Sequence, residues 1–341
     1  MLIMCRYMKN EKIDFILTWV DGNDQKWLEQ KKKYDKNINN SGNCDVRYRD
    51  WEQLKYWFRG IEKYASWVNK VYFVTCGQRP EWLNENNPKL VLINHEDYIP
   101  KKYLPTFSSH TIELNFNRIK NLSEHFVYFN DDVFIINKVK KSDFFKNGFP
   151  RDDYVENILF PNGNDDYFPF IMMNNSEFIN KHFSKREVIK KHFNLYFNFK
   201  YGFSNNLKNI FMLSCHKYSG FSVSHQSSSL LKSTLNCVWD KEPILLDEVC
   251  SHKFRTKNDV NQYIFKYWQY GTGSFIPRKC SFGKNLTISN NNDNIVRTIL
   301  SHKYKTICIN DSEYIENFEL QKKIINDAFE KKFPNKCSFE K

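Results

Sequence analysis

The chain has 341 residues, of which 17% are aromatic, and it carries 51 lysine and arginine residues against 39 aspartate and glutamate residues. The length allows one large or two medium domains, and the aromatic content favours a folded chain over a disordered one. The net charge of +12 favours an anionic partner, which can be a nucleotide-sugar, a phosphorylated polymer, a nucleic acid or an acidic membrane surface.

Nine cysteines are spread along the chain without a C-x-x-C pair, and their odd number indicates a reduced, cytoplasmic protein. No stretch of about 18 apolar residues is present, so we expect no membrane-spanning helix. Residues 1–8 lack the apolar core of a signal peptide. Peripheral attachment to a membrane through basic surface stays open.

The first predicted strand covers Ile13–Val20, an apolar run that ends in the turn-forming sequence DGND at residues 21–24. A carboxylate and a glycine directly after a buried strand can hold the ribose or phosphate of a nucleotide. The alternative is an ordinary turn in which Asp24 caps the following basic helix, predicted over Lys26–Lys36. The residues alone leave both interpretations open.

A second helix is predicted to begin after Asp50, which together with Gln53 resembles a capping box. Its apolar stripe, which we assign to the core, consists of Trp51, Leu54, Phe58, Ile61 and Ala65. Three arginines in or near this helix can meet phosphates, but we favour a solvated or structural role for each of Arg47, Arg49 and Arg59.

Further strands are predicted over residues 70–75, 89–94 and 125–129, and a further helix over residues 111–118. This order of strands and helices predicts an α/β fold with a mostly parallel sheet flanked by helices. Glu113 lies in the helix just before the last of these strands, where it can reach a site or face solvent.

The sequence Asn130-Asp131-Asp132 directly follows the strand at 125–129. Open α/β sheets bind their ligands at the carboxyl ends of strands. Two adjacent carboxylates repel each other unless a cation or hydrogen-bond donors balance them, so the pair favours Mg²⁺ or Mn²⁺ bound through oxygen, with substrate phosphates completing the shell. The alternative is an Asx turn in which Asn130 and Asp131 only cap the backbone.

The pattern is less regular beyond residue 137. Residues 150–166 are predicted to form an irregular insert, and helices are predicted over residues 175–200, 258–270 and 315–332. We divide the chain into residues 11–137, which hold the nucleotide and metal site, and residues 138–341, a more helical half that completes one composite catalytic domain.

Three polar groups of the second half can carry chemistry. His225 lies in a hydroxyl-rich segment, predicted as a loop over residues 224–232, and can act as a general base. Arg255 offers a guanidinium that matches phosphate oxygens, and Asn310-Asp311 follow a short apolar run. Each residue alone is more often structural. Together with metal carboxylates they form the set that phosphoryl transfer requires.

Several enzyme classes lose support because their motifs are missing. The sequence contains neither a P-loop nor a Rossmann dinucleotide fingerprint. It also contains neither the H-E-x-x-H motif of zinc proteases nor the G-x-S-x-G motif of α/β-hydrolases.

Four stretches resemble the successive signatures of the Stealth family. The first is Ile13-Asp14 through Thr18-Trp19-Val20-Asp21-Gly22. The second runs from Arg47-Tyr48-Arg49-Asp50-Trp51 to Phe134 and includes Gly77-Gln78, Trp82-Leu83-Asn84, Leu104-Pro105-Thr106-Phe107 and Asn130-Asp131-Asp132. The third is His225 to Ser233 with Phe254-Arg255, and the fourth is Cys308-Ile309-Asn310-Asp311 with Phe333-Pro334 and Phe339-Glu340.

This family comprises bacterial capsular polysaccharide phosphotransferases and the catalytic core of the lysosomal-enzyme N-acetylglucosamine-1-phosphotransferase. The resemblance implies a Rossmann-like core and the transfer of a hexose-1-phosphate from a UDP-hexose or UDP-N-acetylhexosamine to a sugar hydroxyl of a glycan acceptor. UMP leaves and a phosphodiester remains. It also implies dependence on Mg²⁺ or Mn²⁺, no nucleic-acid partner, and a cytoplasmic location beside the inner membrane and the capsule machinery.

The resemblance also implies roles for single residues. Asp132 is expected to be the main metal ligand, with Asp131 beside it and Glu113 close by. His225 is expected to deprotonate the acceptor, and Arg255 to bind the transferred phosphate. The remaining expected site residues, which complete the polar cluster or line the substrate pocket, are Asp21, Gly22, Gln78, Asn130, Asn310 and Asp311.

One departure from the family pattern concerns the acceptor site. Prolines are expected soon after the histidine of the third signature, whereas here Gln226 and three serines follow. Two other functions stay open. One is a glycosyltransferase that uses the same donor and metal but releases UDP. The other is a non-catalytic glycan- or nucleic-acid-binding protein.

Overall fold

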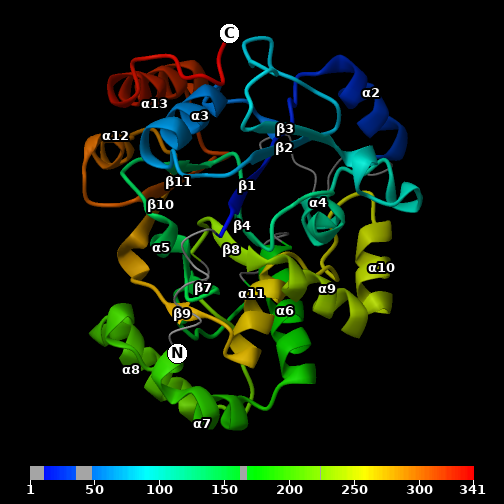
Figure 1. Cartoon of the computed structure of the whole chain (residues 1–341), viewed down its shortest axis with the longest axis vertical. Helices are drawn as coiled ribbons and strands as arrows, with labels where there is room; N and C mark the ends of the chain where they lie inside the picture. Colours follow the sequence, from blue (N-terminus) through cyan, green and yellow to red (C-terminus); the bar gives the residue numbers. More distant parts are fainter. Residues whose placement is uncertain (1–10, 36–47, 162–166, 223) are drawn as a thin grey trace.

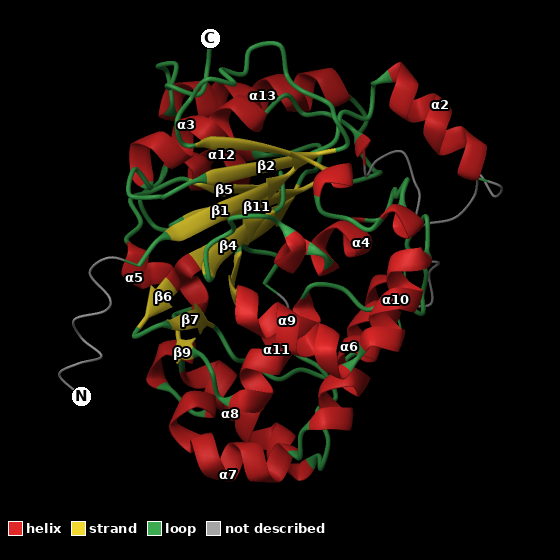
Figure 2. Ribbon diagram, turned by 45° about the vertical axis from the view of Figure 1, so that its right-hand side comes forward, coloured by secondary structure: helices red, strands yellow, loops and turns green. Residues whose placement is uncertain are grey.

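The computed structural model describes residues 11–35, 48–161, 167–222 and 224–341 and has three β-sheets surrounded by helices (Figure 1, Figure 2). The strands are β1 Ile13–Thr18, β2 Val71–Thr75, β3 Leu90–Asn94, β4 His125–Phe129, β5 Val133–Ile135, β6 Phe145–Lys146, β7 Phe149–Asp152, β8 Ser228–Leu231, β9 Ile276–Pro277, β10 Gly283–Thr287 and β11 Thr306–Asn310. The helices are α2 Gln25–Tyr34, α3 Leu54–Tyr64, α4 Ser109–Leu114, α5 Lys141–Phe144, α6 Phe168–His182, α7 Lys185–Tyr196, α8 Phe203–Phe211, α9 Lys232–Lys241, α10 Pro243–Ser251, α11 Tyr263–Thr272, α12 Asp293–Leu300 and α13 Phe318–Lys332.

The largest sheet has the strand order β3-β2-β1-β4-β8. Its first four strands are parallel, with Phe15 of β1 opposite Val71 of β2 and Val127 of β4. The predicted α/β class with a mostly parallel sheet is confirmed. Because β1, β2 and β4 run in the same direction, the polar residues that follow them lie at one edge of the sheet.

The segment predicted as a hydroxyl-rich loop is partly a strand, so that prediction is wrong for residues 228–231. β8 pairs antiparallel with β4, and Ser229 lies opposite Val127. The serines enter the sheet because the backbone of β4 offers an edge to pair with and Leu230 is buried in the core. His225 therefore lies just before β8, the outer strand of the sheet that pairs with β4.

A second sheet has the order β10-β11-β5. β5 follows β4 after only three residues but pairs with β11 instead of extending the large sheet. The chain therefore leaves one sheet and enters another at residues 130–132. β4 also pairs with β8, so two strands from beyond residue 222 flank this turn.

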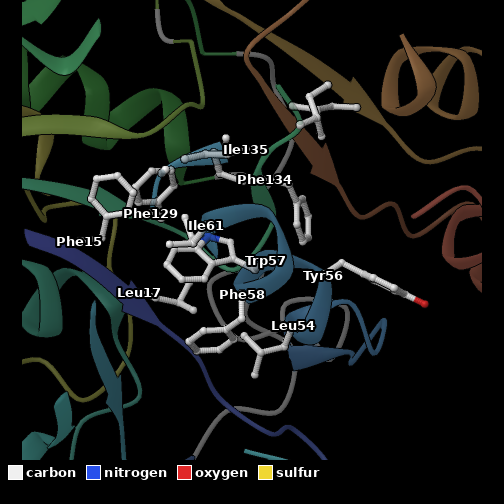
Figure 3. Packing of buried hydrophobic residues seen from close by; sticks show 14 of the residues in the cluster. Phe15, Leu17, Leu54, Tyr56, Trp57, Phe58, Ile61, Phe129, Phe134 and Ile135 are labelled. Atoms are coloured by element: carbon white, nitrogen blue, oxygen red, sulfur yellow. The ribbon is translucent and has the colours of Figure 1, made fainter. Parts of the chain in front are cut away.

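The core between the large sheet and α3 is aromatic: Trp57 of α3 packs on Phe129 of β4, with ring centroids 5.5 Å apart (Figure 3), and Phe58 packs on Phe73 of β2 at 5.8 Å. α3 begins at Leu54, so the predicted start after Asp50 is wrong. The Asp50 carboxylate accepts a hydrogen bond from the backbone of Glu52 at 2.7 Å, and Glu52 has a φ of 56°. This left-handed residue prevents the helix from starting earlier.

The C-terminal part of the chain covers α3 from outside. Phe329 of α13 stacks on Tyr56 of α3, with ring centroids 5.3 Å apart. Arg59 is buried and donates two hydrogen bonds to Glu340 and one to the carbonyl of Phe333. Arg59 is thus structural, as favoured from the sequence, whereas Arg47 lies outside the described residues.

Helices α7 and α8 lie at the end of the molecule opposite α13 in both views (Figure 1, Figure 2). The single helix predicted over 175–200 is two helices, α6 and α7, because Phe183 and Ser184 are extended. The predicted irregular insert contains the end of β7. The helices predicted over 258–270 and 315–332 correspond to α11 and α13. None of the described helices has the length and apolar character needed to cross a bilayer.

Candidate functional site

The carboxylates of Asp131 and Asp132 lie on the turn between β4 and β5. The backbone of this turn is fixed on the second sheet, because the amide of Ile309 donates to the carbonyl of Asp132 at 3.0 Å. Oδ2 of Asp132 faces His225 Nε2 and Cys308 Sγ, each at 3.4 Å. Oδ1 of Asp132 is buried and has no hydrogen-bond partner among the described residues. Such an oxygen is costly unless a ligand satisfies it.

Asp131 is the more accessible member of the pair. Its side chain is reached by solvent. Desolvation by the surrounding protein, followed by the charge of Asp132, nevertheless raises the pKa of Asp131 to about 7. The charge of Asp50 acts in the same direction. A group of carboxylates that raise one another's pKa is an environment that attracts a cation.

His225 is oriented by a chain of polar contacts that begins in α4. The Tyr128 hydroxyl lies 3.1 Å from Oε1 of buried Glu113 and within hydrogen-bond distance of Asn130 Oδ1. With its oxygen facing Tyr128, Asn130 presents its amide nitrogen to His225 and donates to Nε2 at 2.8 Å. Nε2 is therefore an acceptor, the form of imidazole that can take a proton.

The charge state of His225 depends on opposing effects. Burial disfavours the imidazolium, but the charge of Asp132 and the hydrogen bond that the imidazolium donates to this carboxylate act the other way. Glu113 adds to them and Arg255 opposes them, and the net result is a raised pKa for His225. His225 is thus a stronger base than a free imidazole.

One ligand atom each from Asp132, His225 and Cys308 lies within 4.8 Å of the other two. Asp131 and the unsatisfied Asp132 oxygen can hold a divalent cation without the imidazole, which leaves His225 to act as a base, or the cation can take His225 and Cys308 as further ligands. Carboxylate oxygens suit Mg²⁺ and Mn²⁺, whereas imidazole and thiol suit softer ions such as Zn²⁺. The geometry supports a metal site, and it does not identify the metal.

The loop that carries His225 is fixed by the residue that replaces the expected proline. The Gln226 side chain accepts a hydrogen bond from Thr306 of β11 at 2.6 Å. It also lies so close to Gly283 that a Cβ there would meet Gln226 Oε1 at 2.2 Å. Gln226 thus ties the histidine to the second sheet, on the side where Asp132 is fixed.

Arg255 approaches the site from the loop between α10 and α11. Its Nη2 donates to Ser109 of α4 at 2.7 Å. The loop is held by buried Asp259, which accepts hydrogen bonds from Thr256 and binds the rings of His110 and His252 at 2.9 and 2.7 Å. The two histidines and Thr256 hold the pKa of Asp259 far below its usual value despite burial.

Asn310 and Asp311 follow β11. Asn310 Oδ1 lies 3.4 Å from Cys308 Sγ, which connects it to Asp132. Asp311 points elsewhere: it accepts a hydrogen bond from the Trp51 indole at 2.9 Å and lies 3.5 Å from Arg49. Burial raises the pKa of Asp311 against these partners. No described contact joins Asp311 to Asp132.

The three residues expected around a nucleotide form a separate group at the ends of β1 and β2. Gln78 accepts from the backbone amide of Asp21 at 2.8 Å and donates to its carbonyl at 2.9 Å. Gly22 is required by packing, since a Cβ there would lie 1.9 Å from the carbonyl oxygen of Tyr48. Asp24 caps α2 by accepting from the amide of Trp27, so the ordinary-turn interpretation of this residue is confirmed.

The models of two conserved regions of the Stealth proteins match this chain, region 1 over residues 11–38 and region 2 over residues 47–152. The capsular polysaccharide phosphotransferase WcwK of Streptococcus pneumoniae is 48% identical to it, over 98% of this chain and 100% of that protein. The chain belongs to the Stealth family. It is an enzyme of the phosphotransferase class.

Of two further similarities, one supports the family and the other does not bear on the site. The receptor polysaccharide phosphotransferase WefC of Streptococcus gordonii is 40% identical over 97% of this chain and 99% of that protein. A crystal structure of the galactosyltransferase LgtC with donor and acceptor sugar analogues aligns over 92% of this chain and 95% of that one, at 8% identity. Its TM-score of 0.40 is too low to support an argument about this site.

In this Stealth protein, the structure brings five of the eleven residues expected from the sequence into one connected group. Asp131, Asp132, Asn130 and His225 are neighbours, and Glu113 reaches them through Tyr128. Two nearby residues were not assigned to the site from the sequence. Asp50 was interpreted as a helix cap, although its charge raises the pKa of Asp131, and burial and then the charge of Asp21 raise the pKa of Asp50 itself. Cys308 was noted only as part of a signature.

Proposed function

We propose that this Stealth protein transfers a hexose-1-phosphate, typically N-acetylglucosamine-1-phosphate, from a UDP-sugar to a sugar hydroxyl of a surface polysaccharide. UMP is released and a phosphodiester is formed. The reaction is proposed to take place in the cytoplasm, where nucleotide-sugars are made. Relatives named capsular and receptor polysaccharide phosphotransferases support the glycan product.

The observation that carries this proposal is the position of His225. Its Nε2 accepts from Asn130 and lies 3.4 Å from Asp132, so a base and a carboxylate pair face the same place. Transfer of a phosphoryl group needs a base at the incoming hydroxyl and a positive charge at the phosphates. The two must lie close together, because the hydroxyl attacks the phosphorus directly. A carbohydrate-binding protein has no need for this arrangement.

Asp131 and Asp132 would hold Mg²⁺ or Mn²⁺, with the unsatisfied Oδ1 of Asp132 as one ligand. A bound divalent cation neutralises charge on the diphosphate of the donor. Asp21 and Gly22, positioned by Gln78, would line the nucleotide pocket at the same edge of the sheet. Asn310 would contact the donor beside Cys308.

The proposed transfer forms one bond to phosphorus and breaks another. The acceptor oxygen attacks the phosphorus that carries the sugar, its proton moves to His225 Nε2, and the bond from that phosphorus to the bridging oxygen breaks. UMP leaves with the bridging oxygen. Arg255 would stabilise the charge on the phosphorus, and its contact with Ser109 fixes its direction. Glu113 acts through Tyr128 and Asn130 and is a positioning residue, and Asp311 would complete the polar cluster from its contacts with Trp51 and Arg49.

The alternative reaction is glycosyl transfer, in which the bond from the sugar carbon breaks and UDP leaves. Both reactions use the same donor and cation, so the released nucleotide distinguishes them. Purified protein would be incubated with a panel of UDP-sugars, glycan acceptors and Mg²⁺ or Mn²⁺, and the nucleotides resolved by ion-exchange chromatography. We expect UMP, and its release should fall by about 10²-fold or more in His225→Ala.

His216→Ala is the matched control, because His216 is an exposed histidine whose ring contacts Arg186 of α7. It should release UMP at the wild-type rate. Release of UDP would replace the proposed transfer with the glycosyltransferase reaction. UMP release that persists in His225→Ala would remove this residue from the base position.

A further inference from the structure

Exposed apolar side chains are concentrated in one short segment. Among the described residues, seventeen large hydrophobic side chains are exposed, and six of them fall within residues 199–213. These six, which we call the α8 surface, are Phe199, Phe203, Leu207, Ile210, Phe211 and Leu213. Phe199 is 84% exposed, Phe203 81% and Phe211 75%. Such a cluster marks an interaction site, since single exposed residues are ordinary but contiguous patches are not.

Helix α8 has its polar and apolar faces reversed. Its buried residue is Asn209, which accepts from the amide of Glu156 at 2.9 Å and donates to the carbonyl of Tyr196 at 3.0 Å. Phe203, Leu207 and Ile210 recur at helical spacing on the exposed side. A helix that packs on a protein core normally shows the opposite arrangement.

The other two asparagines of α8 are also hydrogen-bonded within the protein. Asn205 donates to the carbonyl of Tyr201 at 2.9 Å, and Asn206 donates to the carbonyl of Asn198 at 2.8 Å. The helix is therefore anchored by hydrogen bonds, and its apolar side chains contribute little to holding it in place. Their exposure calls for an apolar environment outside the chain.

The positive charge around α8 favours an apolar environment that also carries negative charge. Residues 181–217 contain eight lysine or arginine residues and one acidic residue, Glu187. Two of these cations are neutralised by acidic residues outside the segment, Lys185 by Glu156 and Lys181 by Glu242, which leaves a net charge of +5. Exposed Lys190 and Lys191 lie on α7, and exposed Lys208 lies on α8 itself. Both helices lie at the end of the molecule opposite α13 (Figure 2).

We propose that the α8 surface binds the surface of a membrane that contains anionic lipids. Helices that lie in the interface of a bilayer combine aromatic and aliphatic side chains on one face with lysines beside them. A second copy of the chain fits less well, because joining two such faces would bring two strongly positive segments together. The proposal goes beyond the transfer reaction and does not depend on it.

Vesicle flotation of the full-length protein tests the proposal. Binding would be measured with vesicles of phosphatidylcholine alone and with vesicles that also contain phosphatidylglycerol, at low and high salt. We expect binding to the anionic vesicles that weakens with salt. The double variant Phe203→Gln/Phe211→Gln should lower the partition coefficient by about tenfold or more. Lys191→Ala/Lys208→Ala should lower it by about fivefold for each charge, on anionic vesicles only.

The matched control is Ile244→Gln/Tyr314→Gln. These side chains are 83% and 85% exposed, so the number and exposure of the altered apolar residues are the same, but they lie on other elements. The control should bind like the wild type. UMP release with a water-soluble acceptor serves as the separate readout for the catalytic proposal and should be unchanged in Phe203→Gln/Phe211→Gln.

Three results would overturn the proposal. The first is the absence of binding to either kind of vesicle, and the second is binding that the α8 substitutions do not weaken. The third is a protein interface, detected by sedimentation as a wild-type oligomer that Phe203→Gln/Phe211→Gln converts to a monomer without any vesicle binding.

Discussion

Two pairs of consecutive aspartates occupy comparable positions at the ends of strands, Asp131-Asp132 after β4 and Asp152-Asp153 at the end of β7. The two pairs differ in the charges that surround them. Asp132 Oδ1 and Asp153 Oδ1 are both buried without a hydrogen-bond partner among the described residues, and the pKa of Asp131 is raised to about 7. No lysine or arginine forms a described ion pair with Asp131 or Asp132.

The second pair is neutralised by the protein itself. Lys266 of α11 lies 2.8 Å from Asp152, and Arg278 lies 3.9 Å from it. Burial opposes ionisation of Asp152, but these two cations together lower its pKa. Burial raises the pKa of Asp153 to about 6, and Asp152 adds to the effect. The same two residue types therefore form an ion-paired structural element in one place and a carboxylate pair without cationic partners among the described residues, the candidate cation site, in the other.

Removing the unsatisfied carboxylate should have the largest effect. Asp132→Ala is expected to slow UMP release by about 10³-fold, equivalent to about 4 kcal/mol, because loss of the cation leaves the charge of the donor phosphates unbalanced. The urea denaturation curve should show no loss of stability, since the side chain removed is itself poorly satisfied. A wild-type rate would mean that Asp132 is not a ligand.

Lys266→Met should have the opposite pattern. It leaves Asp152 buried without its nearest cation, and we expect the free energy of unfolding to fall by about 3 kcal/mol, measured by urea denaturation. Lys102→Met is the matched control. Lys102 pairs with Asp247 on the surface, so its removal should leave the curve unchanged. Equal losses in the two variants would show that the Asp152 pair is not a buried ion pair in solution.

How far the fold can be predicted from the sequence depends on the range of the contacts. β1, β2 and β4 are buried on both faces, so short apolar runs identify them. The pairings of β4 with β8 and of β5 with β11 join segments separated by about a hundred residues or more, and no local pattern announces them. The helical end of the molecule was least predictable, since α8 is held by asparagines in place of an apolar stripe.

The candidate site shows the same limit. The carboxylate pair and the histidine were identified through their motifs. The sequence does not show that Asn130 orients the imidazole ring of His225 or that Cys308 faces Asp132. Asp50 was misassigned because a capping-box spacing is a local signal. The left-handed backbone of Glu52, between Asp50 and α3, prevents Asp50 from capping the helix. Whether Asp21, Gln78 and Asp311 contact a substrate stays a prediction.

The pH behaviour of the two pairs should differ as well. Asp131 has a pKa of about 7 in the folded protein against 3.8 as the ordinary value. Without a cation, the folded state therefore binds more protons than the unfolded chain between these values, and stability falls as the pH rises through this window. Carbon-detected NMR should show the titration of Asp131 moving to lower pH when Mg²⁺ is added, because a cation favours the carboxylate. Asp153 should not move, and a shift at both residues would point to a general effect of salt.

The smallest expected effect concerns the choice of metal. Cys308 Sγ lies 3.4 Å from Asp132 Oδ2, and a thiol beside a carboxylate and an imidazole favours a soft ion over Mg²⁺. Cys308→Ser should weaken Zn²⁺ binding by about tenfold in calorimetry, while Mg²⁺, which prefers oxygen, should bind no more weakly. Cys250→Ser, a buried cysteine on α10, is the control and should change neither affinity. If Cys308→Ser weakens both ions equally, the thiol shapes the turn and is no ligand, and the difference between the two aspartate pairs rests on the carboxylates alone.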